Sequence, residues 1–67
     1  MNGFVIQLLC VCGRRYYSTC KGDFSPVEKI EDAEKFFYAH QAKKAAEDLM
    51  KTTLGKEYVV VYRIISL

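Results

Sequence analysis

The sequence has no hydrophobic run that could cross a membrane as a helix, which needs about 20 consecutive apolar residues. Its N-terminal run, residues 1–13, reads MNGFVIQLLCVCG. This run is short, no lysine or arginine precedes it, and no small-residue cleavage site follows it, as a secretory signal would require. We therefore expect an internal strand here and no contact of the protein with a membrane.

The sequence also lacks any block of like charge. Ten lysines and arginines are interspersed with eight aspartates and glutamates, for a formal net charge of +2. Dedicated nucleic-acid binders usually concentrate their basic charge, so this composition favours an ordinary solvated surface. There is no catalytic constellation and no nucleotide-binding loop. We expect a protein that is not an enzyme and needs no cofactor.

Cysteine is scarce: the chain has three, an odd number, and no recognisable secretion signal. A disulfide framework is therefore not expected, and we predict reduced thiols in a cytoplasm. Hydrophobic residues, in contrast, make up 51% of the sequence. A chain of this size buries only about 60% of its unfolded surface. We expect residues 1–67 to form one ordered domain with apolar surface left over for a partner or a second copy.

Three segments have the composition of β-strands. Residues 4–12 are apolar except for Gln7, which predicts a central strand that is buried on both faces. Gly13 and Arg14 suit a two-residue hairpin turn, and residues 15–20, RYYSTC, then predict the returning strand. Residues 58–67, YVVVYRIISL, predict the last strand.

A helical segment separates the second strand from the third. Ser25 as N-cap, Pro26 at the first helical position and Glu28 as the third residue after the cap form a capping box, which predicts a helix start at Pro26. Gly55 predicts the end of the helix, because glycine is the usual left-handed residue there.

The helical segment carries two apolar stripes. On a helical wheel, where each residue is rotated by about 100° from the one before, the two stripes face almost opposite ways. The first consists of Ile30, Ala33, Phe36 and Phe37, and the second of Tyr38, Ala42, Ala45, Ala46 and Leu49. One straight helix cannot bury both against one sheet. Either residues 26–52 form one helix that a partner covers on its second side, or the helix breaks within residues 37–39. We favour the break, because it needs no second molecule.

The element order therefore predicts an α+β fold of the ββαβ type. Its three-stranded sheet has the strand order 2-1-3, with the first strand in the middle because it is apolar on both faces. The two-part helix packs on one face of the sheet. The opposite face then presents tyrosine, valine and leucine side chains that nothing else in the chain covers.

The thiols are the first candidate site. Cys10, Cys12 and Cys20 with His40 would supply the four ligands of a zinc ion. The Cys-x-Cys spacing is unlike a zinc knuckle, and a turn at Gly13 and Arg14 would place Cys20 opposite Gln7, away from the other thiols. We favour ordinary core and surface thiols, and therefore no metal. A nucleophilic pair of Cys12 or Cys20 with His40 lacks an orienting third residue.

The second candidate site is a partner-binding surface. On the uncovered sheet face we expect Tyr58 and Tyr62 to contact a partner. The only candidate basic and aromatic surface is the hairpin of Arg14, Arg15, Tyr16 and Tyr17, together with Lys21, Lys43, Lys44 and Arg63. Such a surface could hold phosphates and stack bases, although one of the two hairpin tyrosines could instead pack in the core.

These segments together resemble a group of very small proteins encoded by bacteriophages and related mobile elements. The resemblance is carried by FVIQL, GRRYYS, IEDAEKFF, QAKKAAEDLM and the final Val-rich strand. In that group the Ala-x-x-Phe element, here Ala33 and Phe36, usually precedes a new helix. This sequence differs by the cysteines in its first strand and by a longer SPVEK segment. The resemblance implies a protein that acts in a host bacterial cytoplasm by binding, and inhibiting or redirecting, a host protein.

The sequence thus predicts a non-enzymatic interaction module that binds a host protein through the uncovered sheet face or an edge strand. The alternative is a nucleic-acid-binding accessory protein that uses the hairpin from Arg14 to Tyr17. Homodimerisation through the uncovered face is a third hypothesis. No residue pattern identifies the partner itself.

Overall fold

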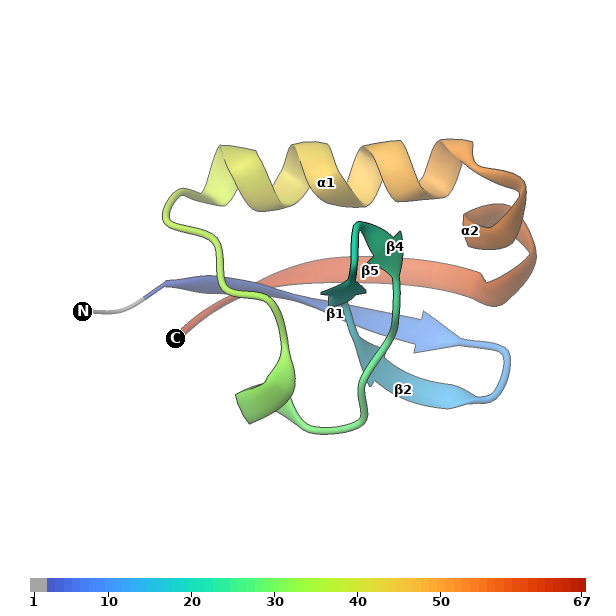
Figure 1. Cartoon of the computed structure of the whole chain (residues 1–67), viewed down its shortest axis with the longest axis horizontal. Coiled ribbons are helices and arrows are strands. Elements are labelled where there is room, and N and C mark those ends of the chain that lie inside the picture. Colours follow the sequence, from blue (N-terminus) through green and yellow to red (C-terminus); the bar gives the residue numbers. More distant parts are fainter. Residues whose placement is uncertain (1–2) are drawn as a thin grey trace.

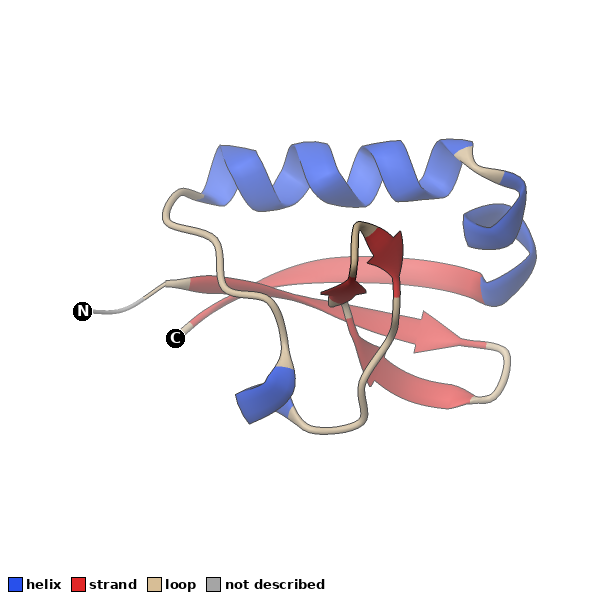
Figure 2. Cartoon of the chain, in the orientation of Figure 1, coloured by secondary structure: helices blue, strands red, loops and turns tan. Residues whose placement is uncertain are grey.

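The computed structural model describes residues 3–67, which form a three-stranded antiparallel sheet with two helices packed against it (Figures 1 and 2). The elements are β1 (Phe4–Cys10), β2 (Gly13–Tyr16), β3 (Thr19–Cys20), β4 (Asp23–Phe24), the 3-10 turn η1 (Ile30–Asp32), α1 (Ala39–Lys51), α2 (Thr53–Tyr58) and β5 (Val59–Ser66). The sheet has the order β2-β1-β5. The predicted α+β class, the strand order and a broken helix packed against the sheet are confirmed, although the break lies between α1 and α2.

The central strand β1 places alternate side chains on opposite faces, as every strand does. Ile6, Leu8 and Cys10 are buried on the face that α1 covers. From the helix, Ala42, Ala46 and Leu49 pack onto them, which confirms the second apolar stripe as the core stripe. The small alanine side chains allow the helix to lie close to the sheet, where α1 contacts both β1 and β5.

The predicted helix start at Pro26 is wrong. The segment before α1 is extended apart from η1, and its backbone pairs with the sheet (Figure 1). Tyr16 and Val27 exchange two hydrogen bonds of 2.8 and 3.0 Å, and Phe4 and Phe36 exchange two of 2.9 and 2.8 Å. A helix would have to break these four bonds to the sheet. The hydrogen bonds to the sheet therefore outweigh the local capping signal. The first long helix starts at Ala39, at the predicted break.

This extended backbone also changes which residues of the first stripe are buried. Ala33 is buried and Phe36 packs against the core, as expected. Phe37 and Tyr38, which the helical wheel assigned to the two stripes, are instead 59% and 54% exposed. Both residues lie in a bend before α1 and not in a helix, so the helical angles do not apply to them.

The first hairpin turns earlier than predicted. Cys10 pairs with Gly13, so the turn consists of Val11 and Cys12. Gly13 has a φ of 125°, a conformation that side chains other than glycine rarely adopt, which explains a glycine directly after the turn. Gln7 consequently pairs with Tyr16 and not with Cys20.

The returning strand is shorter than the predicted residues 15–20, because Phe36 occupies the position beside Phe4 at the start of β1. The chain therefore leaves the sheet after Tyr17. Residues 19–24 fold back on themselves as the small β3–β4 hairpin, which lies in front of the sheet in Figure 1.

Gly55 does not end the helix, as the sequence predicted. It lies inside α2 and is buried. The break between the helices is at Thr52, whose φ and ψ of −82° and 157° are extended. Its hydroxyl donates to the Leu49 carbonyl at 2.6 Å and accepts from the Gly55 amide at 2.9 Å, so it ends one helix and caps the next.

Candidate functional site

The face of the sheet away from α1 is partly open. Two rows of paired residues lie across it: Arg14, Leu9 and Val61 in the first row, and Tyr16, Gln7 and Arg63 in the second. Directly paired residues of an antiparallel sheet point to the same face. Val5, the next residue of β1 on this face, is fully buried, so the open part is the region around Leu9.

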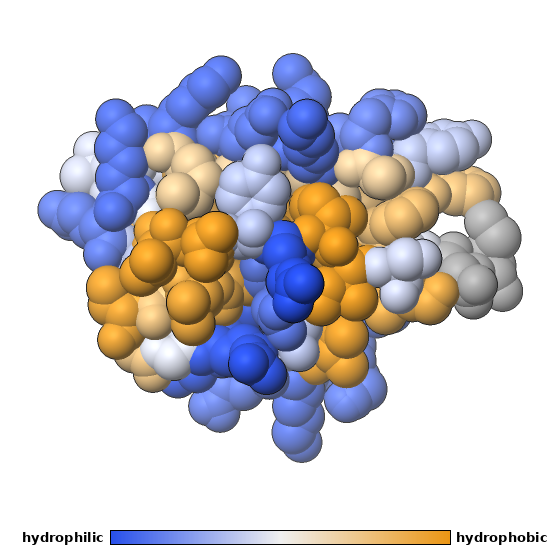
Figure 3. Space-filling model, turned by 180° about the vertical axis from the view of Figure 1, so that it is seen from behind, coloured by the Kyte–Doolittle hydropathy of each residue, from blue (hydrophilic) through white to orange (hydrophobic). Residues whose placement is uncertain are grey.

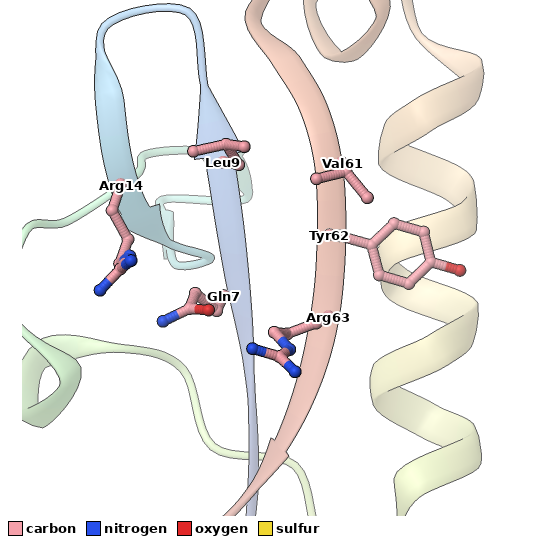
Figure 4. Close-up of a pocket in the computed structure, with 6 residues that line it drawn as sticks. All are labelled: Gln7, Leu9, Arg14, Val61, Tyr62 and Arg63. Carbon is pink, nitrogen blue, oxygen red and sulfur yellow. The ribbon is translucent and has the colours of Figure 1, made fainter.

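An open groove of about 430 Å³ occupies this region. It is lined by Gln7, Leu9, Arg14, Val61, Tyr62 and Arg63 (Figure 4). We call it the outer-face groove. Figure 4 shows the Tyr62 ring pointing toward α1, so this residue contributes to the groove mainly through its backbone.

The floor of the outer-face groove is aliphatic. Leu9 and Val61 are paired across β1 and β5, yet they are 48% and 53% exposed. Val60 lies next to them, with 62% of its surface exposed. Seen from behind, the molecule shows two hydrophobic areas below α1 that are separated by hydrophilic surface (Figure 3). The lining of the groove likewise combines aliphatic side chains with polar and charged ones.

The charge in the outer-face groove has one sign. Arg14 comes from β2 and Arg63 from β5, and Figure 4 shows Gln7 of β1 between them. No carboxylate is among the six lining residues. The Gln7 amide donates to the Tyr16 hydroxyl over 3.4 Å. Because guanidinium groups stay charged at all ordinary pH values, the groove presents two permanent cations beside an apolar floor.

The six residues predicted to bind a partner lie on two different faces. Arg14 and Tyr16 belong to the outer face. Arg15 pairs with Leu8 on the helix side and donates from Nη1 to the Arg14 carbonyl at 2.8 Å. Tyr17 packs against the core, with ring centroids 5.7 Å from Phe24 and 5.9 Å from Phe36.

Tyr58 and Tyr62 also pack against the core. Tyr58 accepts a hydrogen bond of 3.2 Å from the Cys12 thiol, and this contact raises the pKa of the phenol. The predicted set of six therefore contributes Arg14, and the backbone of Tyr62, to the groove.

The four candidate metal ligands are distributed over three elements and a turn. Cys10 is buried, and burial raises the pKa of its thiol. Cys12 and Cys20 are exposed, on the first turn and on β3. His40 is exposed in the first turn of α1. Within residues 3–67, no three His, Cys, Asp or Glu side chains are grouped so that they could hold a metal ion.

Sequence reasoning missed an exposed stack of three rings at the start of α1. The rings of Phe37 and Tyr38 have centroids 5.0 Å apart, and those of Tyr38 and His40 are 5.4 Å apart, with 12° between the planes in both pairs. The succession Phe-Phe-Tyr-Ala-His at the predicted break was the signal for it. Nucleic-acid bases stack on exposed aromatic rings of this kind.

Sequence reasoning also missed Gln7, Leu9, Val61 and Arg63 as one surface. Their common face follows from the period of two along β1 and β5, but their positions side by side depend on the register. The register of β1 against β5, which pairs Leu9 with Val61 and Gln7 with Arg63, joins distant parts of the chain and is not set by a local turn.

No helix of the described chain, residues 3–67, is long and apolar enough to cross a membrane. Comparisons with protein-family models, curated proteins and solved structures returned no match to this chain.

Proposed function

We propose that this chain is a non-enzymatic binding module that holds another protein in the outer-face groove. The observation that carries the proposal is the pair Leu9 and Val61, two aliphatic side chains on the central strand β1 and the neighbouring strand β5 that are about half exposed. Protein interfaces combine such an apolar centre with arginine, while other charged residues are depleted there. Arg14 and Arg63 supply that arginine at the border of the groove.

The proposed mode is binding to the face of the sheet and not to its edge. The outer strand β5 has an irregular register: Leu9 pairs with Val61 and Cys10 with Val59, which leaves Val60 as an extra, unpaired residue. A bulge of this kind twists an edge strand and hinders the addition of another strand. The bulge does not hinder binding to the outer-face groove, because that binding adds no strand to the edge of β5.

The partner in this proposal is a host bacterial protein, whose activity the bound chain inhibits or redirects. The support is the resemblance of FVIQL, GRRYYS and QAKKAAEDLM to small phage-encoded proteins. A domain of this size changes the activity of a larger protein most simply by covering a surface that the larger protein needs.

Nucleic-acid binding is the second candidate function. The hairpin from Arg14 to Tyr17 supports it weakly, because Tyr17 packs in the core and the Tyr16 hydroxyl is bonded to Gln7. The feature that favours it is the exposed stack of Phe37, Tyr38 and His40, since bases stack on aromatic faces.

Capture from a nuclease-treated bacterial lysate tests the proposed function with two matched variants. Val61 and Leu54 are both 53% exposed, and Leu54 is not part of the groove lining. We expect Val61→Glu to lose a partner that the wild type and Leu54→Glu both retain. A partner that survives Val61→Glu but is lost with Leu54→Glu would refute the groove. Binding of nucleic acid that weakens steeply with added salt would favour the second function.

A further inference from the structure

The outer-face groove has a charge pattern that selects a class of partner. Its two guanidinium groups lie on either side of Gln7, and none of its six lining residues is acidic. We infer, resting on the proposed function, that the partner inserts an extended segment of the pattern acidic-x-apolar-x-acidic. In this arrangement Arg14 and Arg63 each bind one carboxylate, and the apolar side chain lies on Leu9 and Val61.

The spacing of the two arginines supports this pattern. Arg14 is paired with Leu9, and Arg63 with Gln7, so they are two strands apart and two residues apart along β1. With about 4.8 Å between strands and about 3.4 Å per residue, their Cα atoms are roughly 12 Å apart. In an extended segment, residues i and i+4 point the same way and lie about 13 Å apart. The residue i+2 between them faces the middle of the groove.

The chemistry of the two ends supports carboxylates in particular. A guanidinium group presents a planar set of donors that binds a carboxylate through two parallel hydrogen bonds. The Gln7 side chain, between the arginines, adds an amide that can bond to the backbone of the segment (Figure 4). The apolar floor of Leu9 and Val61 excludes water beside these bonds, which strengthens them.

A second copy of this chain fits the groove less well. In a two-fold dimer built on this face, each groove would face its own image. Four guanidinium groups would then share one interface, and the lining supplies no carboxylate to neutralise them. Like charges brought together in this way oppose binding.

A single nucleic-acid strand also fits less well. Such a strand needs exposed rings beside the cations. The ring on this face belongs to Tyr16, which is half-buried and bonded to Gln7.

Selection from a displayed library of random ten-residue peptides on the immobilised full-length chain tests the inference. We expect the acidic-x-apolar-x-acidic pattern to be enriched on the wild type and lost on the double variant Arg14→Gln, Arg63→Gln. The matched control is Lys43→Gln, Lys44→Gln, which removes the same charge from exposed positions of α1 and should leave the enrichment unchanged. For the best peptide, each arginine replacement should weaken binding by about five- to tenfold.

The other outcomes separate this inference from the proposed function. One outcome is enrichment of apolar peptides that have no acidic residues and that no longer bind to Val61→Glu. This result would overturn the acidic segment but leave the groove as the binding surface. Enrichment that neither the arginine variant nor Val61→Glu changes would overturn both. A selection that enriches no pattern above the starting library would overturn the acidic segment. Circular dichroism of each variant shows that a loss of binding is not a loss of fold.

Discussion

Gly55 lies so close to the Leu49 carbonyl oxygen that a Cβ at position 55 would overlap the backbone of α1. The main chains of the two helices therefore lie directly against each other, at the position where the Thr52 hydroxyl bonds to both. This junction turns the chain from α1 toward β5, and so it positions Val59 and Val61 against β1.

Gly55→Ala should destabilise the protein, because the clashing atom belongs to the backbone and cannot rotate away. We expect a loss of about 1–3 kcal/mol in the free energy of unfolding, the usual range for overpacking. Urea titration followed by circular dichroism measures this. Lys56→Ala, an exposed change in the same helix, should stay within about 0.5 kcal/mol of the wild type. Equal stability of the two variants would show that the junction is not tight.

Thr52→Val keeps the shape of the side chain and removes its hydroxyl. Since that hydroxyl caps α2 through the Gly55 amide, we expect a loss of about 0.5–2 kcal/mol. Thr52→Ser retains the hydroxyl and should recover most of the stability in the same urea titration. If serine and valine are equally destabilising, the hydroxyl does not stabilise the junction.

Leu49→Ala tests the core stripe of α1. Leu49 is 6% exposed and packs in the main cluster with residues of β1 and β5, so its truncation should cost roughly 2–5 kcal/mol. Such a loss is large enough to unfold a domain of this size. Thermal unfolding of Leu49→Ala should therefore show little or no cooperative transition, while Glu47→Ala on the exposed side unfolds like the wild type. A cooperative Leu49→Ala variant of wild-type stability would mean that another surface of the helix is the buried one.

Tyr17 should make the protein sensitive to alkaline pH. Burial raises the pKa of its phenol above the ordinary value of 10.0, and the charges of Glu34 and Asp48 raise it further. Since the folded state then holds the proton more tightly than the unfolded state, the stabilisation is complete below the ordinary pKa and is lost as the pH rises through the folded pKa. From about pH 9 to about pH 11 the wild type should therefore lose more free energy of unfolding than Tyr17→Phe does. If the free energy of unfolding falls equally in the wild type and in Tyr17→Phe, Tyr17 does not cause the sensitivity to alkaline pH.

The sequence predicted the parts of the fold that depend on regular periods. The alternation along β1 and the stripe of Ala42, Ala46 and Leu49 were sufficient for the central strand and for the core side of the helix. The helix start at Pro26 failed for a physical reason: a capping box is a local signal, and the bonds of Phe36 to Phe4 come from a distant part of the chain. Such pairing is visible only in the folded structure.

The candidate site was predicted in part. Arg14 was identified because it lies in a basic and aromatic hairpin, and an uncovered sheet face was expected. Arg63 belongs to the same predicted basic and aromatic surface. Leu9 was not identified as a neighbour of Arg14, because the predicted turn at Gly13 and Arg14 gives a different register from the observed turn at Val11 and Cys12. Tyr58 was expected in the last strand, but it is the last residue of α2. Tyr62 pairs with Leu8, and so it lies on the helix side of the sheet.

Site-specific photocrosslinking tests the outer-face groove most directly. A photoreactive amino acid replaces Val61 in one variant and Leu54, which has the same exposure, in another, and both are irradiated in a bacterial lysate. We predict a defined covalent adduct with one protein from position 61, which excess unlabelled wild type abolishes, and none from position 54. An adduct that forms from position 54 and not from position 61 would contradict the proposal that this groove is the binding surface.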